Sequence, residues 1–108
     1  MARPVVEPLK RAVVLGGSVA GLLAARVLTD HAEEVVLIER DDLSSGPGDR
    51  RGVPQGNQVH GLLARGLELM EAMFPGLTGE LADGGAEVAD PGVDCEWWMT
   101  GARKPPSG

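Results

Sequence analysis

The sequence contains a single cysteine, Cys95, among its 108 residues. One cysteine excludes an internal disulfide, and it excludes a zinc site that depends on several thiolates. Free cysteines are among the residues most often found in protein interiors. We therefore expect Cys95 to be a small buried or half-buried packing group, without a redox role.

Long apolar runs are also missing. No stretch approaches the length of about 18 residues that a membrane-spanning helix needs, and residues 1–10 lack the apolar core of a signal peptide. We therefore expect a cytoplasmic protein with no integral membrane segment.

Basic residues are scarce and scattered, with ten Lys and Arg against 16 Asp and Glu and a formal net charge of −6. Phosphate backbones are bound by clustered cations, so nucleic acid is not an expected partner.

The remaining composition is typical of a globular protein, with 43% hydrophobic and 24% charged residues. The length suits one small domain and is too short for a dinucleotide-binding domain plus a separate substrate domain. With 16 glycines and eight prolines, much of the chain is expected to form turns and loops.

Two short apolar runs flank a helical pattern near the start of the chain. The run RAVVL (11–15) stops at two glycines, and apolar side chains at helical spacing follow from Ala20 to Leu28. The second run, VVLIE (35–39), ends with a carboxylate. Strand, helix and strand within so few residues predict a parallel pair joined by a right-handed crossover, in a sheet covered on both faces. The predicted fold class is α/β, with a Rossmann-like βαβ dinucleotide-binding unit.

Weaker patterns fill the rest of the chain. We predict, in chain order, a surface loop over 41–57, a helix over 59–74, a helical turn over 77–84, short strands over 87–89 and 96–100, and an exposed tail over 102–108. Asn57 is the expected N-cap of the second helix. Trp97 and Trp98 would face opposite sides of the last strand, and packing is their expected role.

A glycine-rich turn lies between the first strand and the first helix. Its six residues are Gly16, Gly17, Ser18, Val19, Ala20 and Gly21. In a dinucleotide-binding turn the first glycine permits a tight bend and the last lets the helix pack closely on the strand. Ser18 replaces the usual second glycine, so we expect the loop to lie slightly further from a pyrophosphate, with the hydroxyl able to donate a hydrogen bond. Free amides at the helix start supply further anion affinity.

Glu39 gives this turn a partner. It ends the second strand 18 residues after Gly21, where a carboxylate can bind the ribose hydroxyls of an adenosine. Taken singly, the turn could be an ordinary strand-to-helix connection and Glu39 a solvated strand end. Together they favour a site for the ADP half of a dinucleotide, most simply FAD. The same carboxylate repels a 2′-phosphate, which argues against NADP at this turn.

The segment RRGVPQGNQVH (50–60) spans the end of the predicted loop and the start of the predicted second helix. Arg50 and Arg51 could pair with pyrophosphate oxygens, and a solvated basic turn is the alternative. Neutral polar side chains that could line a flavin pocket come next, at Gln55, Asn57, Gln58 and His60. We expect His60 to be a hydrogen-bonded structural residue. No catalytic residue and no metal site is assigned.

Three segments carry a family resemblance: VVLGGSVAGLLAARVL, VVLIER and RRGVPQGNQVHGLLARGLELMEAMFPGL. They resemble the start of bacterial FAD-dependent monooxygenases of the para-hydroxybenzoate hydroxylase-like superfamily, and most of all the polyene epoxidases of polyether pathways of the lasalocid and monensin type. The glycine turn is shared by many flavoproteins, whereas GVPQG followed by H and LL is more specific. The resemblance implies a glutathione-reductase-type FAD domain, with its N-terminal part in residues 1–100 and an exposed linker or cut loop at 101–108.

The resemblance also implies roles for individual residues. The glycine turn would hold the pyrophosphate, Glu39 the adenosine ribose, and Arg40 would lie near the adenine. Arg50, followed by Gly52 and Val53, would reach the FAD, while Gln55 and His60 would lie near the flavin or the substrate channel. The candidate cofactor-binding residues are therefore Gly16, Gly17, Ser18, Val19, Ala20, Gly21, Glu39, Arg40, Arg50, Val53, Gln55 and His60.

As the resemblance implies, NADH or NADPH reduces the flavin, oxygen forms a C4a-hydroperoxide, and one oxygen atom passes to an alkene of a hydrophobic polyketide. An aromatic hydroxylase or a flavin-dependent halogenase is the nearest alternative. A non-catalytic module that binds NAD or FAD is an alternative of another class. Enzymes of this family are several times longer, and their later motifs have no match here, so we expect the remainder of the enzyme as a second chain.

Overall fold

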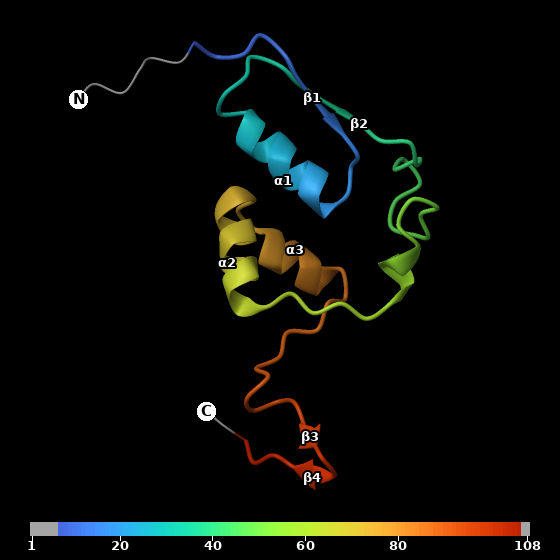
Figure 1. The fold of residues 1–108 in the computed structure, drawn as a ribbon, viewed down its shortest axis with the longest axis vertical. Helices are drawn as coiled ribbons and strands as arrows, with labels where there is room; N and C mark the ends of the chain where they lie inside the picture. Colours follow the sequence, from blue (N-terminus) through green and yellow to red (C-terminus); the bar gives the residue numbers. More distant parts are fainter. Residues whose placement is uncertain (1–6, 107–108) are drawn as a thin grey trace, which may run out of the picture. The chain divides into compact units, whose positions relative to one another are not determined.

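The computed structural model describes residues 7–106. The prediction that residues 1–10 are not a signal peptide lies largely outside the described residues, and so do the last two residues of the predicted tail. The elements are β1 (Ala12–Leu15), α1 (Val19–Leu28), β2 (Val35–Ile38), a 3₁₀ turn η1 (Pro54–Asn57), α2 (Ala64–Met73), α3 (Leu77–Asp83), β3 (Trp98–Met99) and β4 (Ala102–Arg103) (Figure 1). The chain forms two compact units that divide between Pro75 and Gly76. The fold is mixed α/β. No helix in the described part of the chain is both long and apolar enough to cross a bilayer.

The first unit is built on a βαβ arrangement. β1 and β2 pair in parallel, with Ala12 opposite Val35 and Leu15 opposite Ile38, and α1 connects them. The backbone amide of Gly16 donates to the carbonyl of Ile38 at 2.8 Å, which continues the ladder just past the end of β1. The prediction of strand, helix and parallel strand is therefore confirmed.

The core of this unit lies between the sheet and α1. Ala12 and Val14 are buried, whereas the alternate residues Val13 and Leu15 are 53% and 79% exposed. Successive side chains of a strand point to opposite faces, so one face of β1 packs and the other is open. The expectation of a sheet covered on both faces is wrong for the described residues.

The apolar face of α1 is narrower than its sequence pattern suggests. Leu23 and Leu28 are half-buried, but Ala24 and Val27, which share the predicted stripe, are exposed. A charged residue contributes to the packing instead: Arg26 donates from Nε to the carbonyl of Met73 at 2.9 Å. Cations are favourable at the C-terminal carbonyls of a helix, so this bond ties α1 to the end of α2.

The second helix begins five residues later than predicted. Residues 59–63 are not helical, Leu63 has an extended backbone (φ −71°, ψ 152°), and α2 starts at Ala64 without a side-chain cap. The expected N-cap, Asn57, is instead the last residue of η1. Within α2 the predicted packing residues Leu67, Met70 and Met73 are half-buried.

The second unit corrects several expectations. α3 confirms the predicted helical turn, but residues 87–89 form no strand. β3 pairs with β4 in a small antiparallel hairpin, with Trp98 opposite Arg103, so the segment predicted as the start of an exposed tail contains a strand. Two-residue strands are too short to produce a recognisable alternation of apolar and polar residues.

Three residues expected to pack are exposed. The side chains of Trp97 and Trp98 lie on the surface, and the indole nitrogen of Trp97 donates to the carbonyl of Pro91. Cys95 is exposed as well. These expectations assumed a core that the short hairpin does not provide.

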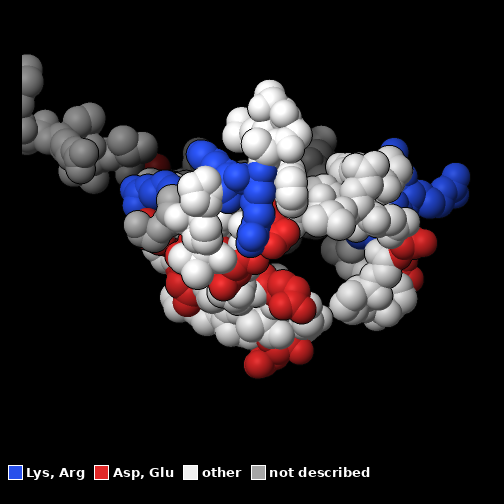
Figure 2. All heavy atoms as spheres, turned by 90° about the horizontal axis from the view of Figure 1, so that it is seen from below, with Lys and Arg blue, Asp and Glu red and all other residues white. Residues whose placement is uncertain are grey.

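Charged side chains of both signs are mixed on the surface. On the face drawn in Figure 2, basic and acidic side chains lie next to one another. Exposed ion pairs join Arg65 to Glu68 and Arg103 to Glu96. Pairs of this kind contribute about 1 kcal/mol or less, so they do not explain the fold.

Candidate functional site

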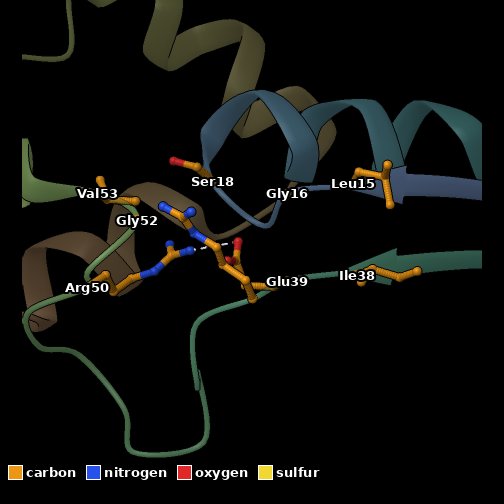
Figure 3. A pocket seen from close by; sticks show the side chains of 9 residues that line it. Leu15, Gly16, Ser18, Ile38, Glu39, Arg50, Gly52 and Val53 are labelled. Atoms are coloured by element: carbon orange, nitrogen blue, oxygen red, sulfur yellow. Dashed lines mark ion pairs between the residues drawn. The ribbon is translucent and has the colours of Figure 1, made fainter.

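A pocket of about 370 Å³ lies where β1 and β2 end (Figure 3). Its lining residues are Leu15, Gly16, Ser18, Ile38, Glu39, Arg40, Arg50, Gly52 and Val53. Ligands of open α/β sheets bind outside the carboxyl ends of the strands. The pocket is thus at the edge of the sheet where such a ligand is expected.

The glycine turn is shaped by two of its glycines. Gly16 has φ of +103°, a conformation that side chains strongly disfavour. A Cβ atom on Gly21 would lie 1.7 Å from the carbonyl oxygen of Gly16, so the first turn of α1 can approach the end of β1 only without a side chain there. The structural roles predicted for these two glycines are confirmed.

Ser18 is the N-cap residue of α1 and lines the pocket. Its side chain makes no capping hydrogen bond, and the first turn of the helix contains no acidic residue. In Figure 3 it points away from Glu39. No carboxylate within the helix itself balances the positive end of the α1 dipole, whereas Glu39 reaches the turn from the end of β2 and accepts the Gly17 amide. Val19, Ala20 and Gly21 form the first turn behind it.

Glu39 directly follows β2 and is held at the turn by several donors. Its Oε2 accepts the amide of Gly17 at 2.5 Å and lies 2.8 Å from a guanidinium nitrogen of Arg50, and its Oε1 accepts the amide of Asp41 at 3.0 Å. The side chain is 11% exposed. These contacts occupy about three of the four acceptor positions of a carboxylate. A bond to both ribose hydroxyls would require one of them to be shared or displaced.

The same donors keep Glu39 ionised. The amides of Asp41 and Gly17, and then the charge of Arg50, lower the pKa of its carboxyl group from 4.5 to about 2. Glu39 is consequently an anion at all physiological pH values.

Arg50 returns from the loop after β2 to the pocket. Besides Glu39, its guanidinium lies 3.5 Å from a carboxylate oxygen of Asp41 and donates to the carbonyl of Gly17 at 3.4 Å. Its side chain is 24% exposed. The Nε atom is buried and, despite its ion-pair distance to Asp41, makes no hydrogen bond within residues 7–106. Figure 3 shows the guanidinium directed at the Glu39 carboxylate.

The structure brings together half of the candidate residues around one pocket: Gly16, Ser18, Glu39, Arg40, Arg50 and Val53. Gly17 is adjacent, buried, and bonded to Glu39. Gln55 and His60 do not line the pocket. Gln55 is in η1, and the exposed His60 ring has Nδ1 2.8 Å from the carbonyl of Gln58. Arg51 is exposed and is not part of the lining. A cofactor role for Gln55 and His60 stays a prediction.

Comparison with known proteins gives one relative. The chain is similar to Protein Rv3254 of Mycobacterium tuberculosis, with 41% identity over 95 residues. That match takes in 88% of this chain and 20% of the relative, so the chain spans about a fifth of the length of the curated relative it matches. No protein-family model and no solved structure matches the chain.

Sequence reasoning missed three residues of the pocket lining, Leu15, Ile38 and Gly52, and the neighbouring Asp41. Leu15 and Ile38 are the last residues of β1 and β2, so their place follows from the strand ends. Asp41 and Gly52 join the pocket through a contact between the loop and the strand end: the Gly52 amide donates to Asp41 Oδ2 at 2.9 Å. The only sequence signal for that contact is an acidic residue two positions after Glu39 and a glycine two positions after Arg50.

Proposed function

We propose that the pocket binds the ADP half of FAD, and that the chain is the N-terminal part of a Rossmann-like FAD domain of the glutathione-reductase type. The observation that carries this proposal is the convergence of the glycine turn, the Glu39 carboxylate and the Arg50 guanidinium on one pocket at the ends of two parallel strands. Each of these groups has a counterpart in the chemistry of an adenosine diphosphate.

The phosphate end would lie at the start of α1. Helix N-termini bind anions through free amides and the helix dipole, and the α1 N-terminus has no side-chain cap. A guanidinium can pair with two phosphate oxygens at once, and Arg50 has a buried Nε without a hydrogen-bond partner in the described part of the chain. These features fit a diphosphate.

The ribose end would lie at Glu39. Its carboxylate is ionised and borders the pocket, so it can accept a hydrogen bond from a ribose hydroxyl. The negative charge disfavours a 2′-phosphate at the same place. The pocket therefore fits FAD or NAD better than NADP.

The reaction proposed for the whole protein is an FAD-dependent monooxygenation, by preference the epoxidation of an alkene in a hydrophobic polyketide. Support for it comes from the family resemblance of residues 10–80. When bound, the flavin supplies electron transfer and oxygen activation, with NADH or NADPH as the electron donor. The residues of this chain bind and orient the nucleotide end of the cofactor. Aromatic hydroxylation and halogenation use the same cofactor and remain alternatives.

Flavin analysis tests the proposal. The chain is purified together with any protein that stays bound to it, its absorbance spectrum is recorded, and the ligand released on denaturation is identified by chromatography. We expect FAD, and we expect intact mass spectrometry to detect a companion chain that carries the rest of the enzyme. A colourless protein that retains or binds NAD would favour a non-catalytic nucleotide-binding module. Failure to bind FAD, NAD or ADP would refute the nucleotide site altogether.

Glu39→Gln is the variant that tests whether the FAD is held at this pocket. The change keeps the size of the side chain and removes its charge. If FAD is held at this pocket, the variant should retain less of it than the unmodified chain does under identical washing. Equal retention of FAD by the variant and the unmodified chain would show that Glu39 is not part of the site. It would not by itself refute FAD binding by other residues.

A further inference from the structure

We propose that Asp41 is a positioning residue that holds the Arg50 guanidinium at the nucleotide pocket. The role rests on the proposed function, because Arg50 is useful there only if the pocket accepts a diphosphate. Asp41 does not line the pocket itself. It acts through the two residues of the loop that it contacts, Arg50 and Gly52.

The contacts of Asp41 join the strand end to the far end of a long loop. Its backbone amide donates to Glu39, its Oδ2 accepts the amide of Gly52 at 2.9 Å, and the same oxygen lies 3.5 Å from Nε of Arg50. The side chain is 12% exposed, whereas residues 42–49 between these contacts are all exposed. An exposed loop of this kind depends on contacts at its ends for a fixed position.

Gly52 is fitted to this contact. A Cβ atom on Gly52 would lie 2.8 Å from Asp41 Oδ2 and 3.0 Å from Nε of Arg40. Any side chain at position 52 would therefore push the carboxylate of Asp41 away or displace the guanidinium of Arg40. The Asp41 carboxylate keeps its present position beside Gly52 because residue 52 has no side chain.

Asp41 also changes what Arg50 can do. With two carboxylates beside it, the guanidinium is shared between Glu39 and Asp41, and its remaining nitrogen is directed at the carbonyl of Gly17 in the glycine turn. Without Asp41, Arg50 would have Glu39 as its remaining carboxylate partner, and the loop would lose its anchor at Gly52. Arg50 would then be free to leave the phosphate end of the pocket.

Two probes separate this role from a general structural one. ADP contains the diphosphate that Arg50 is proposed to contact, and adenosine lacks it. Binding of each is measured by titration calorimetry on the full chain, with any companion it retains, for the unmodified protein and for Asp41→Ala, Asp41→Asn and Arg50→Ala. Circular dichroism reports whether each variant is folded.

We expect Asp41→Ala to weaken ADP binding by about tenfold, because the diphosphate would lose the charged hydrogen bond proposed for Arg50. Adenosine lacks the diphosphate, so its binding should change by less than about twofold. Glu39 keeps the amides of Gly17 and Asp41 in that variant, so the ribose site persists. Asp41→Asn retains an acceptor for Gly52 and should fall between the two. Because Asp41 is proposed to act through Arg50, adding Asp41→Asn to Arg50→Ala should weaken ADP binding no further.

Several results would overturn the assignment. Equal weakening of ADP and adenosine by Asp41→Ala would show a merely structural role. If the losses of ADP binding free energy were additive in the double variant of Asp41→Asn and Arg50→Ala, the two residues would act independently. This comparison does not need Asp41→Ala, so it remains decisive even if that variant does not fold. An unmodified chain that binds ADP while all Asp41 variants bind it equally well would refute the role of Asp41 alone. An unmodified chain that binds no ADP would refute the proposed function and this role together.

Discussion

Replacing Gly21 by alanine tests how closely α1 approaches the glycine turn. The added Cβ would lie 1.7 Å from the carbonyl oxygen of Gly16 and 2.9 Å from its carbonyl carbon. Favourable carbon-to-oxygen contacts begin near about 3.3 Å, so the turn or the helix would have to move by about 1.5 Å. Both contacted atoms belong to the backbone, and no rotation of a side chain can relieve the overlap.

The cost follows from that displacement. Overpacking of this kind destabilises proteins by about 1 to 3 kcal/mol, and the better helix propensity of alanine returns about 0.5 to 1 kcal/mol. For a domain of this size each kcal/mol corresponds to about 4 to 8 °C in Tm. We therefore expect Gly21→Ala to lower Tm by several degrees and to weaken ADP binding, since the shifted segment includes Gly16 and Ser18, which line the pocket.

Gly66→Ala in α2 is the matched control. Its Cβ would meet only Cδ1 of Leu62, at 3.4 Å, and that flexible side chain can move. The control should leave stability unchanged or raise it by about 0.5 to 1 kcal/mol. Thermal denaturation and ADP titration of both variants decide the matter. If Gly21→Ala matched Gly66→Ala in Tm and in ADP affinity, the close contact between α1 and the turn would be refuted.

Other predictions concern the acidic end of the pocket. Glu39→Gln should weaken ADP binding by about tenfold. It should also reduce the preference for 5′-AMP over 2′,5′-ADP, two ligands that differ only in the 2′-phosphate, measured by competition; an unchanged preference would argue against a ribose partner at position 39. Glu39 is ionised down to about pH 2 in the folded chain but protonates near 4.5 when unfolded, so its stabilising effect is complete above pH 4.5 and is lost as pH falls towards 2. The Tm difference between the unmodified chain and Glu39→Gln should narrow over that window, and a constant difference would contradict the lowered pKa. Gly52→Ala should lower ADP affinity because its Cβ would meet the Asp41 carboxylate at 2.8 Å and that carboxylate would have to shift, and an ADP affinity equal to that of the unmodified chain would contradict a role for this contact.

The βαβ arrangement could be predicted from local sequence because its signals are local. Two short β-branched runs, a helical repeat and the spacing of Gly16 and Gly21 specify the elements and their order. The start of α2 could not be predicted in the same way, because apolar residues at 59–63 continue the helical spacing although the chain there is not helical. Tertiary context decides such boundaries.

The exposed positions show a second limit. Predictions that Cys95, Trp97 and Trp98 pack, and that β1 is covered on both faces, use the average behaviour of those residue types. In the described residues the hairpin offers no core and one side of β1 is open. Residue type alone does not say which surfaces a given stretch of chain has available for burial.

Much of the pocket could be predicted because the glycine turn and Glu39 lie at fixed positions of the βαβ arrangement. The part formed by Asp41, Arg50 and Gly52 could not, since it depends on how residues 42–49 fold back toward the strand end. An irregular loop produces no periodic pattern of apolar and polar residues, so its path cannot be predicted from the sequence. Arg50 was recognised as a candidate by its charge, but its position between two carboxylates emerged only from the structure.

The glycine turn and the end of β2 are proposed to bind the two ends of one adenosine diphosphate. Titration of the ¹⁵N-labelled chain with ADP, followed by two-dimensional NMR, tests it directly. We expect the largest amide shifts at Gly16, Gly17 and Ser18 and at Asp41 beside Glu39, with much smaller changes in α2, none of whose residues lines the pocket. Larger shifts in α2 than at the turn, or no shifts at the turn under saturating ADP, would contradict the assignment of this site.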